Sequence, residues 1–464
     1  MIYSKKAVPG YFNSMILLLI FLFSLLSGMT FAQSNSGSRA NVFRAAVVKA
    51  DITPDSPKQL LGYNARLSRG IHDRIYHRII ALDDGVTQFL LVSSELCLMS
   101  PSEYDHVAEL LQKKLGINPL NFWWSVSHTH SAPEVGVPGL LSVFLGDRYN
   151  HPIDTGYTNF IEQTLINGIV EARQKLQPAK LGIGWGFSQA NINRRALDVD
   201  GKASLGLNPD GPVDRRIGLI RLEKQDGTPL ALIANYPIHG TVLGHLNLLI
   251  SGDVAGIVSE YVEQKSGAPV LFINGAAGNL APIYSVYPDP KAGHLDQFRV
   301  LLGDKILDAN KKILSTSDSI KLFTGALIVE SPGKHGLTWP SYLSNYTGVS
   351  KHGDTMVKVP VRFLRINEDV AIWSAPLELF CEISNEIRER SPFPFTFYYG
   401  YTNGWMGYLP TEKEWAHGGY EVEDVCPYKP EMGNQLTEAV SAYLQGEMKS
   451  VPAGTQKGKK KVSH

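Results

Sequence analysis

Two histidines at the end of one expected strand carry the clearest chemical signal in the sequence. The segment Ser127-His-Thr-His-Ser-Ala-Pro133 directly follows an apolar run at 122–126 that is typical of a β-strand. Residues two apart in a strand share a face, but the turn that Pro133 announces should break this regularity. One of His128 and His130 could then bind a metal ion while the other serves a different role beside it, or the pair could simply cap a turn.

Two further segments could complete a metal site. Asn235-Tyr-Pro-Ile-His-Gly240 also ends an expected strand, and Gly240 lets the backbone turn sharply after His239. Glu378 closes the segment Ser374-Ala-Pro-Leu-Glu378 and would complete a His/His/Glu set, which is a usual shell for a catalytic zinc ion. The alternative for Glu378 is a position in the first turn of a helix, which the helix dipole favours.

An aspartate follows the His239 strand at a glycine turn. Asp253, in the segment Asn247-Leu-Leu-Ile-Ser-Gly-Asp253, is placed to orient a ligand histidine from outside the metal shell. The alternative is a helix N-cap, because Ser251 or Asp253 precedes a helical stretch at 255–264. The two roles are compatible.

Aromatic residues and cysteines narrow the possible sites. Aromatics and glycines crowd the segment at 400–411 and continue to Tyr420, which indicates either a pocket wall or a surface loop of stacked rings. The cysteines are Cys97, Cys381 and Cys426, so at most one disulfide can form. Because no CxxC pair occurs, we expect metal ligands to be His, Asp, Glu or Tyr and not a thiolate.

Short β-rich runs alternate with longer helical ones along the chain. The pattern predicts strands at 43–49, 88–93, 122–126, 230–236 and 270–273, and helices at 102–115, 157–176, 255–264 and 378–390. It also predicts a hairpin between 357–365 and 370–373, in which Pro360 favours an edge position for the first strand. We therefore expect an α/β protein with a mixed central sheet flanked by helices, in a single large catalytic domain at 43–450.

The N-terminus reads as a signal peptide, residues 1–32. Two lysines precede an apolar run at 15–26, which is shorter than the roughly 20 residues that a membrane-spanning helix needs. Cleavage after Ala32 predicts a secreted or periplasmic protein without a stable membrane span; a membrane anchor is the alternative. Residues 33–42 are expected to form a flexible lead-in, and residues 451–464 a disordered basic tail.

The composition argues against a nucleic-acid partner. Of the 464 residues, 44% are hydrophobic and 19% charged, which is ordinary for a folded protein with a large core. Lys plus Arg and Asp plus Glu number 44 each, and no basic stripe or nucleic-acid-binding motif occurs. The partner that we expect is a small-molecule or lipid-like substrate, and no oligomeric state is predicted.

Taken together, these segments resemble the neutral/alkaline, non-lysosomal ceramidase family. The similarity runs from about residue 46 to about residue 423, and it is specific because many short pieces occur in a shared order. Besides the histidine and glutamate segments above, the matching pieces are Asp51-Ile-Thr-Pro54, Gly62-Tyr63, Gly70-Ile-His-Asp-Arg74, Asn191-Ile-Asn-Arg194, Ser251-Gly-Asp253 and 408–420.

The resemblance implies a role for each site residue. The positions that match the family's zinc ligands are His128, His239, Glu378 and Tyr408. His130 matches the histidine of the same motif that faces the substrate, and Tyr420 matches a tyrosine beside the substrate carbonyl. Arg194, in the Asn-Ile-Asn-Arg motif, is expected to reach the pocket.

The chain also departs from the family pattern. Where ceramidases carry Gly-Asp-Val-Ser-Pro, this sequence has Gly-Asn-Leu-Ala-Pro at 278–282, so Asn279 replaces the aspartate and Ala281 the serine. That serine lies at the family's active site and is often given a catalytic role. We expect no serine nucleophile at position 281 and no counterpart of the family's C-terminal immunoglobulin-like domain.

The expected function is therefore a secreted zinc-dependent hydrolase, ceramidase-like, that uses zinc-activated water on an amide or ester bond of an N-acyl-type substrate. The metal and Tyr420 would stabilise charge on the carbonyl oxygen. His130 would protonate the leaving group, because an ordinary histidine pKa lies near operating pH. The alternatives are a zinc hydrolase of a glycan-derived or other non-lipid substrate, and a catalytically impaired ligand-binding homologue.

Overall fold

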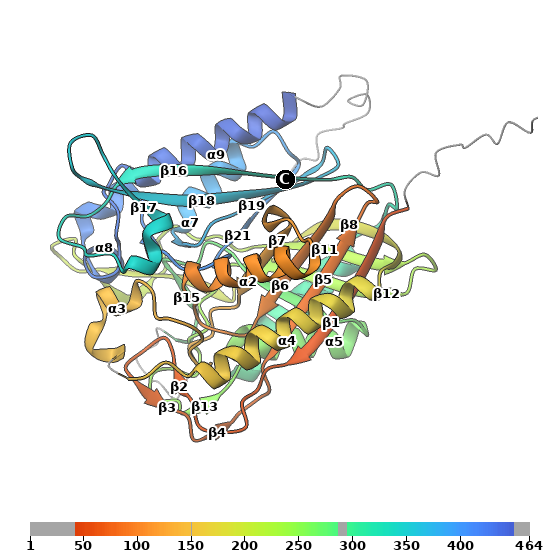
Figure 1. Cartoon of the computed structure of the whole chain (residues 1–464), viewed down its shortest axis with the longest axis horizontal. Coiled ribbons are helices and arrows are strands. Elements are labelled where there is room, and N and C mark those ends of the chain that lie inside the picture. The colour runs from red at the N-terminus through yellow and green to blue at the C-terminus, as the bar shows by residue number, and fades with distance from the viewer. Residues whose placement is uncertain (1–41, 150, 286–294, 450–464) are drawn as a thin grey trace, which may run out of the picture. The chain divides into compact units, whose positions relative to one another are not determined.

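The computed structural model describes residues 42–149, 151–285 and 295–449 (Figure 1). The expected signal peptide, the basic tail and all but the last residue of the lead-in lie outside these ranges. The described residues from Val42 onward belong to one compact unit. Within them, no helix is both long enough and apolar enough to cross a membrane.

A mixed sheet of eight strands forms the larger layer. Its order is β14-β12-β11-β8-β1-β5-β6-β7, in which β12–β14 and β6–β7 pair parallel and the other neighbours antiparallel. The strands are β1 (Arg44–Asp51), β5 (Tyr76–Asp83), β6 (Gln88–Ser94), β7 (Phe122–Val126), β8 (Gln177–Phe187), β11 (Arg216–Lys224), β12 (Pro229–Tyr236) and β14 (Val270–Asn274). The predicted mixed sheet is confirmed.

A second sheet packs against the first. Its order is β16-β18-β19-β21, with β17 paired to β18, and only β19–β21 is parallel. The strands are β16 (Leu322–Pro332), β17 (Thr347–Val349), β18 (Thr355–Ile366), β19 (Val370–Ser374) and β21 (Phe395–Tyr399). Ile80 and Leu91 of the large sheet share one buried cluster with Leu364 and Ile372 of the small sheet. Apolar side chains of both sheets therefore form a common core.

Helices cover the outer faces of both sheets. Along β5, side chains alternate, so Ile80 faces the second sheet while Ile79 faces the helices. The helices over the large sheet are α2 (Pro101–Leu115), α4 (Thr155–Gln174), α5 (Asp253–Ser266) and α6 (Lys305–Lys311); those over the small sheet are α7 (Cys381–Arg390) and α9 (Met432–Lys449). Figure 1 shows α9 above the small sheet, with the large sheet on its other side. The result is four layers, helix–sheet–sheet–helix.

Two sequence-based expectations about elements are wrong. The helix expected from residue 378 begins at Cys381, because Glu378 and Leu379 instead form a short strand, β20. The strand with Pro360 is not an edge strand, since β18 lies between β16 and β19. At Pro360 itself, however, only β16 is paired, because β19 pairs from Arg362 onward. The missing N–H of the proline therefore removes little hydrogen bonding from the sheet.

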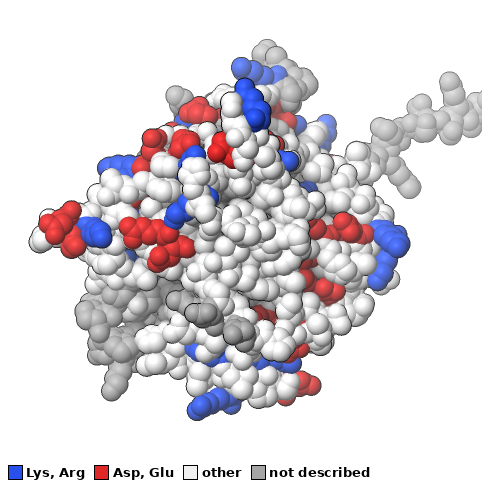
Figure 2. Space-filling view, turned by 60° about the vertical axis from the view of Figure 1, so that its left-hand side comes forward, with Lys and Arg blue, Asp and Glu red and all other residues white. Residues whose placement is uncertain are grey.

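The charged surface residues are mixed in sign. On the face that Figure 2 shows, acidic and basic residues lie interspersed around a broad area of uncharged residues. This agrees with the equal numbers of acidic and basic residues in the sequence, 44 of each.

The close packing of α4 against the large sheet gives a prediction about stability. A Cβ added at Gly168 of α4 would lie 2.4 Å from Cδ1 of Ile79 on β5. Overpacking costs typically 1–3 kcal/mol, partly offset by the better helix propensity of alanine, so we expect Gly168→Ala to destabilise the protein by about 1 kcal/mol. Ile79→Val removes the clashing methyl group, so the double variant should lose less stability than the two single changes together. Thermal unfolding of all four proteins tests this, and strictly additive losses would contradict it.

Candidate metal centre

Two histidine segments are joined by a backbone contact. Thr129 and Gly240 form a parallel bridge, in which His130 N–H donates to the Gly240 carbonyl at 2.8 Å and Gly240 N–H donates to the His128 carbonyl at 3.2 Å. This bridge lies just past the C-terminal ends of β7 and β12. A side chain at Gly240 would collide, because a Cβ there would lie 2.6 Å from the His128 carbonyl oxygen and from Thr129 Cα. Glycine is therefore needed for the two histidine segments to meet.

The strand alternation breaks at His128, as the sequence suggested. His128 has a φ of 65°, in the left-handed region that few non-glycine residues adopt. The rings of His128 and His130 stand edge to face, with centroids 4.7 Å apart and an interplanar angle of 86°. The two imidazoles therefore differ in orientation, and strain at this residue is typical of a functional position.

A second pairing brings the carboxylate to the tyrosine. Glu378 and Tyr408 are direct partners in the short parallel pair β20 (Glu378–Leu379) and β22 (Tyr408–Leu409). Glu378 follows β19 and Tyr408 follows β21 in the chain, so both reach the site from the small sheet. Gly278 lets the neighbouring loop pack closely, since a Cβ there would lie 2.6 Å from the Glu378 carbonyl oxygen.

Three distances among the four candidate donor atoms are close to those expected in a tetrahedral metal shell. Oε2 of Glu378 lies 3.2 Å from His128 Nε2 and 3.1 Å from His239 Nε2. The Tyr408 hydroxyl lies 3.3 Å from His239 Nε2. Ligands about 2.0–2.1 Å from a tetrahedral ion are about 3.3–3.4 Å apart, so these residues fit a zinc-sized ion.

His130 lies outside this shell. Its Nε2 is 3.2 Å from His128 Nε2, but its ring centroid is 5.8 Å from that of His239, against 4.6 Å for His128. The ligand atoms of His128, His239 and Glu378 lie within 4.8 Å of one another, whereas His130 belongs to a second such group, with Cys97 and His128. His128 thus belongs to both groups, whereas His130 is not part of the group that contains Glu378.

Backbone carbonyls orient the two candidate ligand histidines. Nδ1 of His128 lies 3.1 Å from the Cys97 carbonyl oxygen, and Nδ1 of His239 lies 2.9 Å from the Leu280 carbonyl oxygen. Each contact leaves Nε2 free for a metal. The expectation that Asp253 orients a ligand histidine is wrong, because its carboxylate accepts the N–H groups of Val242, Leu243 and Val254 instead.

Sequence reasoning also missed the residues that hold the carboxylate. Trp405 Nε1 donates to Glu378 Oε1 at 2.9 Å, and the Tyr401 hydroxyl donates to Oε2 at 3.3 Å. Tyr401 additionally stacks on His128, with ring centroids 4.3 Å apart. The aromatic segment is therefore largely interior support for the site, while Tyr408 and Tyr420 alone from this stretch line the pocket described below.

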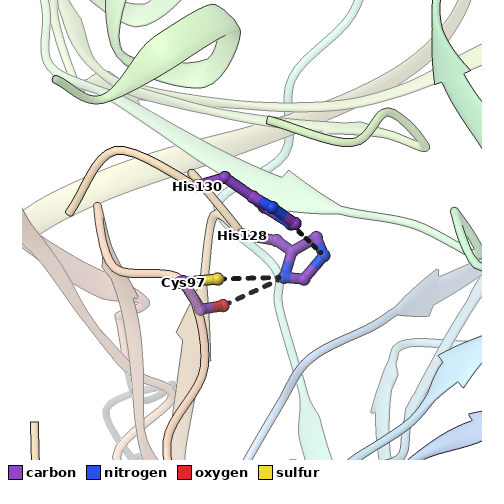
Figure 3. A group of neighbouring side chains, drawn as sticks. All are labelled: Cys97, His128 and His130. Atoms are coloured by element: carbon purple, nitrogen blue, oxygen red, sulfur yellow. Dashed lines mark hydrogen bonds between the residues drawn. The ribbon is translucent and has the colours of Figure 1, made fainter. Parts of the chain in front are cut away.

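Cys97 lies beside His128, which the sequence analysis did not foresee. Figure 3 shows the thiol and carbonyl of Cys97 at Nδ1 of His128, while His130 faces the other ring nitrogen. The sulfur is 3.9 Å from Nδ1. The absence of a CxxC pair was thus a poor reason to discount a cysteine here. Burial raises the pKa of the Cys97 thiol well above its usual value, which favours a neutral thiol over a thiolate.

Burial sets the protonation of the site. It lowers the pKa of His239 to about 3, so the ring is in the neutral form that binds metals. Burial alone would raise the pKa of Glu378, but its interactions with His128 and His239 bring it well below its usual value. Burial, then His128 and His239, lower the pKa of His130 well below that of an ordinary histidine, contrary to the value expected near operating pH.

A cavity of about 660 Å³ opens onto the candidate ligands. Its lining residues are Gly62, Tyr63, Asn64, Arg66, His130, Arg194, Leu205, Thr241, Gly244, His245, Ala281, Ser285, Tyr408 and Tyr420. Ala281 is at the wall, as expected, whereas Asn279 is turned away from the cavity. The Asn279 amide donates to Glu382 and accepts the backbone N–H of Cys381, so it ties the loop to α7.

Arg194 reaches the cavity and contacts a candidate ligand. Its Nη2 donates to the Tyr408 hydroxyl at 3.1 Å, and its Nε donates to Glu421 at 2.9 Å. Burial raises the pKa of Tyr408 well above its usual value, and the neighbouring Glu378 raises it further, while the charge of Arg194 opposes both. The guanidinium would therefore favour a phenolate at Tyr408.

Comparison with known proteins identifies the family. The model for "Neutral/alkaline non-lysosomal ceramidase, N-terminal" matches residues 43–275, just over half of the chain. The chain therefore belongs to this family, and the resemblance seen in its motifs is confirmed.

Similar proteins come from distant organisms. Neutral ceramidase B of Dictyostelium discoideum is 30% identical over 47% of this chain and 31% of its own length. The neutral ceramidase of Pseudomonas aeruginosa is 28% identical over 53% of this chain and 38% of its own length. A crystal structure of the latter protein superposes with a TM-score of 0.70 at 20% identity, covering 89% of this chain and 75% of that chain. The fold is thus shared, while the alignable sequence spans well under half of these relatives.

The close approach at Gly240 gives a prediction about metal retention. Gly240→Ala should force the two histidine segments apart, because its Cβ meets backbone atoms that cannot swing away. We expect the purified variant to retain much less divalent metal than the wild type, measured by elemental analysis. Gly446→Ala, where an added Cβ meets nothing within 4 Å, is the control and should retain metal fully. Equal metal content in both variants would refute the geometric requirement.

Proposed function

We propose that this chain is a single-zinc hydrolase that cleaves an N-acyl amide bond. The observation that supports the proposal best is the close approach of His128, His239, Glu378 and Tyr408, in which Glu378 lies 3.1–3.2 Å from both histidines and Tyr408 lies 3.3 Å from His239. Membership of the ceramidase family supports amide hydrolysis as the reaction. The proposed reaction splits the amide C–N bond with one water, giving a carboxylate and an amine.

The residues around the ligands have separate tasks in this proposal. A zinc ion bound there would supply a Lewis acid that polarises the carbonyl and lowers the pKa of water to about 7. His130, neutral at rest, would accept a proton from the attacking water and pass it to the departing nitrogen. Tyr420 would donate a hydrogen bond to the carbonyl oxygen as negative charge develops on it. Arg194 would act on Tyr408, holding its oxygen in place.

Ala281 favours a direct attack by water in this proposal. Alanine has no hydroxyl, so it can neither attack the carbonyl nor donate a hydrogen bond to it. Among the described residues, the aliphatic hydroxyls that line the cavity belong to Thr241 and Ser285, which lie 3.1 Å apart and bond to each other. A single displacement without an acyl-enzyme follows as the proposed course.

The proposal includes a compartment and two alternatives. Residues 1–32 have the pattern of a signal peptide, so we place the protein in the periplasm or outside the cell. A glycan-derived or other non-lipid substrate is the first alternative. A ligand-binding homologue without turnover is the second, motivated by Ala281. Screening the zinc-loaded protein against acyl amides, esters and glycosides separates the three, because only the last predicts no turnover of any.

The role of His130 can be separated from metal binding. Because His130 lies outside the donor shell, His130→Ala should keep one zinc per chain but lose about 10²–10⁴-fold in turnover. Glu378→Gln should lose the metal as well as activity. Elemental analysis and steady-state kinetics on both variants make the comparison. A His130→Ala protein without zinc would show that the two histidines of the motif have been assigned the wrong way round.

The cavity lining gives a prediction about substrate size. Among the described lining residues only Leu205 and Ala281 are aliphatic, which is little surface for a long acyl chain. We therefore expect poor hydrolysis of long-chain ceramide in detergent and faster turnover of short N-acyl amides, with zinc-free protein as the blank. Ceramide turnover near the enzyme median of about 10 s⁻¹ would contradict the expectation.

A further inference from the structure

Arg66 places an unneutralised positive charge in the cavity wall. It belongs to the short strand β3 (Arg66–Leu67), which pairs with β2 (Gln59–Leu60), and it is 8% exposed. Within the described residues no carboxylate lies within ion-pair distance of it, whereas Arg194 in the same wall is paired with Glu421. Buried arginines are normally paired with an acid, so a lone one needs an explanation.

The contacts of Arg66 are all to uncharged groups. Its guanidinium donates to the carbonyl oxygens of Asn247 at 2.8 Å, Leu61 at 3.2 Å and His130 at 2.6 Å. The guanidinium carbon lies 4.7 Å from the ring centroid of Tyr63. Nε is buried and has no hydrogen-bond partner among the described residues. Carbonyl dipoles and a ring face orient the cation, but they do not cancel its charge.

The rest of the cavity wall has the same bias. Among the described residues, its ionisable side chains are arginine, histidine and tyrosine, and neither aspartate nor glutamate lines it. On the face that Figure 2 shows, by contrast, acidic and basic residues are interspersed. A cavity wall with a cation and no acids favours a negatively charged ligand over a neutral one of the same shape.

We infer that the substrate carries a carboxylate close to the scissile amide and that Arg66 determines this specificity. The Arg66 guanidinium lies over Tyr63, whose ring centroid is 4.8 Å from that of His130, so the charge that it recognises lies near the reacting bond. One unpaired guanidinium matches the single charge of a carboxylate better than the −1.5 to −2 of a phosphate monoester. The substrate class is then an N-acyl amino acid. This inference rests on the proposed amide hydrolysis.

The alternative is that Arg66 has only a structural role and holds backbone segments together. Its three carbonyl contacts join the segments at 61, 130 and 247, so losing them could disturb His130. Such a role would affect charged and neutral substrates equally. The decisive quantity is therefore the ratio of kcat/KM for an anionic substrate to that for a neutral one of the same size.

The test uses N-butyrylglycine and its neutral match, N-butyrylglycinamide, on the zinc-loaded full chain. We expect the wild type to prefer the anionic substrate by about 10-fold or more, which is typical of a hydrogen bond to a charged group. Arg66→Gln should reduce the ratio to near one, and Arg66→Lys should keep most of it. Arg69→Gln, an exposed arginine three residues away, is the control and should leave the ratio unchanged.

Three outcomes would overturn or redirect the inference. A wild-type ratio near one, or a ratio unchanged in Arg66→Gln, overturns it while leaving amide hydrolysis standing. Preference for N-butyryltaurine over N-butyrylglycine overturns the choice of a carboxylate in favour of a sulfonate. If neither compound is turned over, the proposed function fails, and calorimetric binding of the same pair to wild type and Arg66→Gln decides the inference by the same ratio. Equal or undetectable binding of both would then refute it.

Discussion

The site depends on two backbones that come into direct contact between Thr129 and Gly240. Strand ends of a sheet normally stay about 4.8 Å apart and diverge into loops. Here β7 and β12 are not neighbours in the large sheet, so the parallel bridge beyond their ends is a separate contact, which the absent side chain of Gly240 makes possible. Without that contact, His128 and His239 would not lie close enough together to bind one metal ion. The carbonyl oxygens of Cys97 and Leu280, which contact Nδ1 of the two rings, would then no longer orient them towards a common site.

Buried charges around this contact balance one another in two separate groups. Glu378 is surrounded by His128, His239, Tyr401 and Trp405, so its charge is stabilised by hydrogen bonds where burial would otherwise penalise it. Farther out, Glu421 accepts from both Arg194 and Arg195, at 2.9 and 2.7 Å. Arg66 belongs to neither group, and no aspartate or glutamate is among the described residues that line the cavity.

The sequence predicted the elements that carry strong local patterns. The apolar run before His128 coincides with β7, and the helical spacing at 102–115 coincides with α2. Both were predictable because burial of an element imposes a pattern on its apolar residues. The long strands β8 and β11 were missed, since glycine and charged residues interrupt their alternation. Glu378 looked like a helix start, and only a partner strand distant in sequence, β22, makes it a strand. Local propensity carries no information about such a partner.

The site itself was predictable in its residue types but not in its support. A resemblance of motifs named the candidate ligands, and their side-by-side placement follows from pairings that no local pattern reveals. Cys97 and Leu280 contact the histidine rings through carbonyl oxygens, which every residue has, so these contacts could not be predicted from residue type. The role of Arg66 was equally unpredictable from the sequence, because it depends on the lack of nearby carboxylates among the described residues.

The candidate ligands are divided equally between the two sheets. His128 and His239 follow strands of the large sheet, and Glu378 and Tyr408 follow strands of the small one. The layers also meet directly, since Val126 N–H donates to the Tyr401 carbonyl and Asn403 N–H to the Trp124 carbonyl. An ion held by all four side chains would be a cross-link between halves of the fold made by distant parts of the chain. Its binding free energy would then count towards the docking of one sheet on the other, so the temperature at which the layers separate would depend on metal concentration.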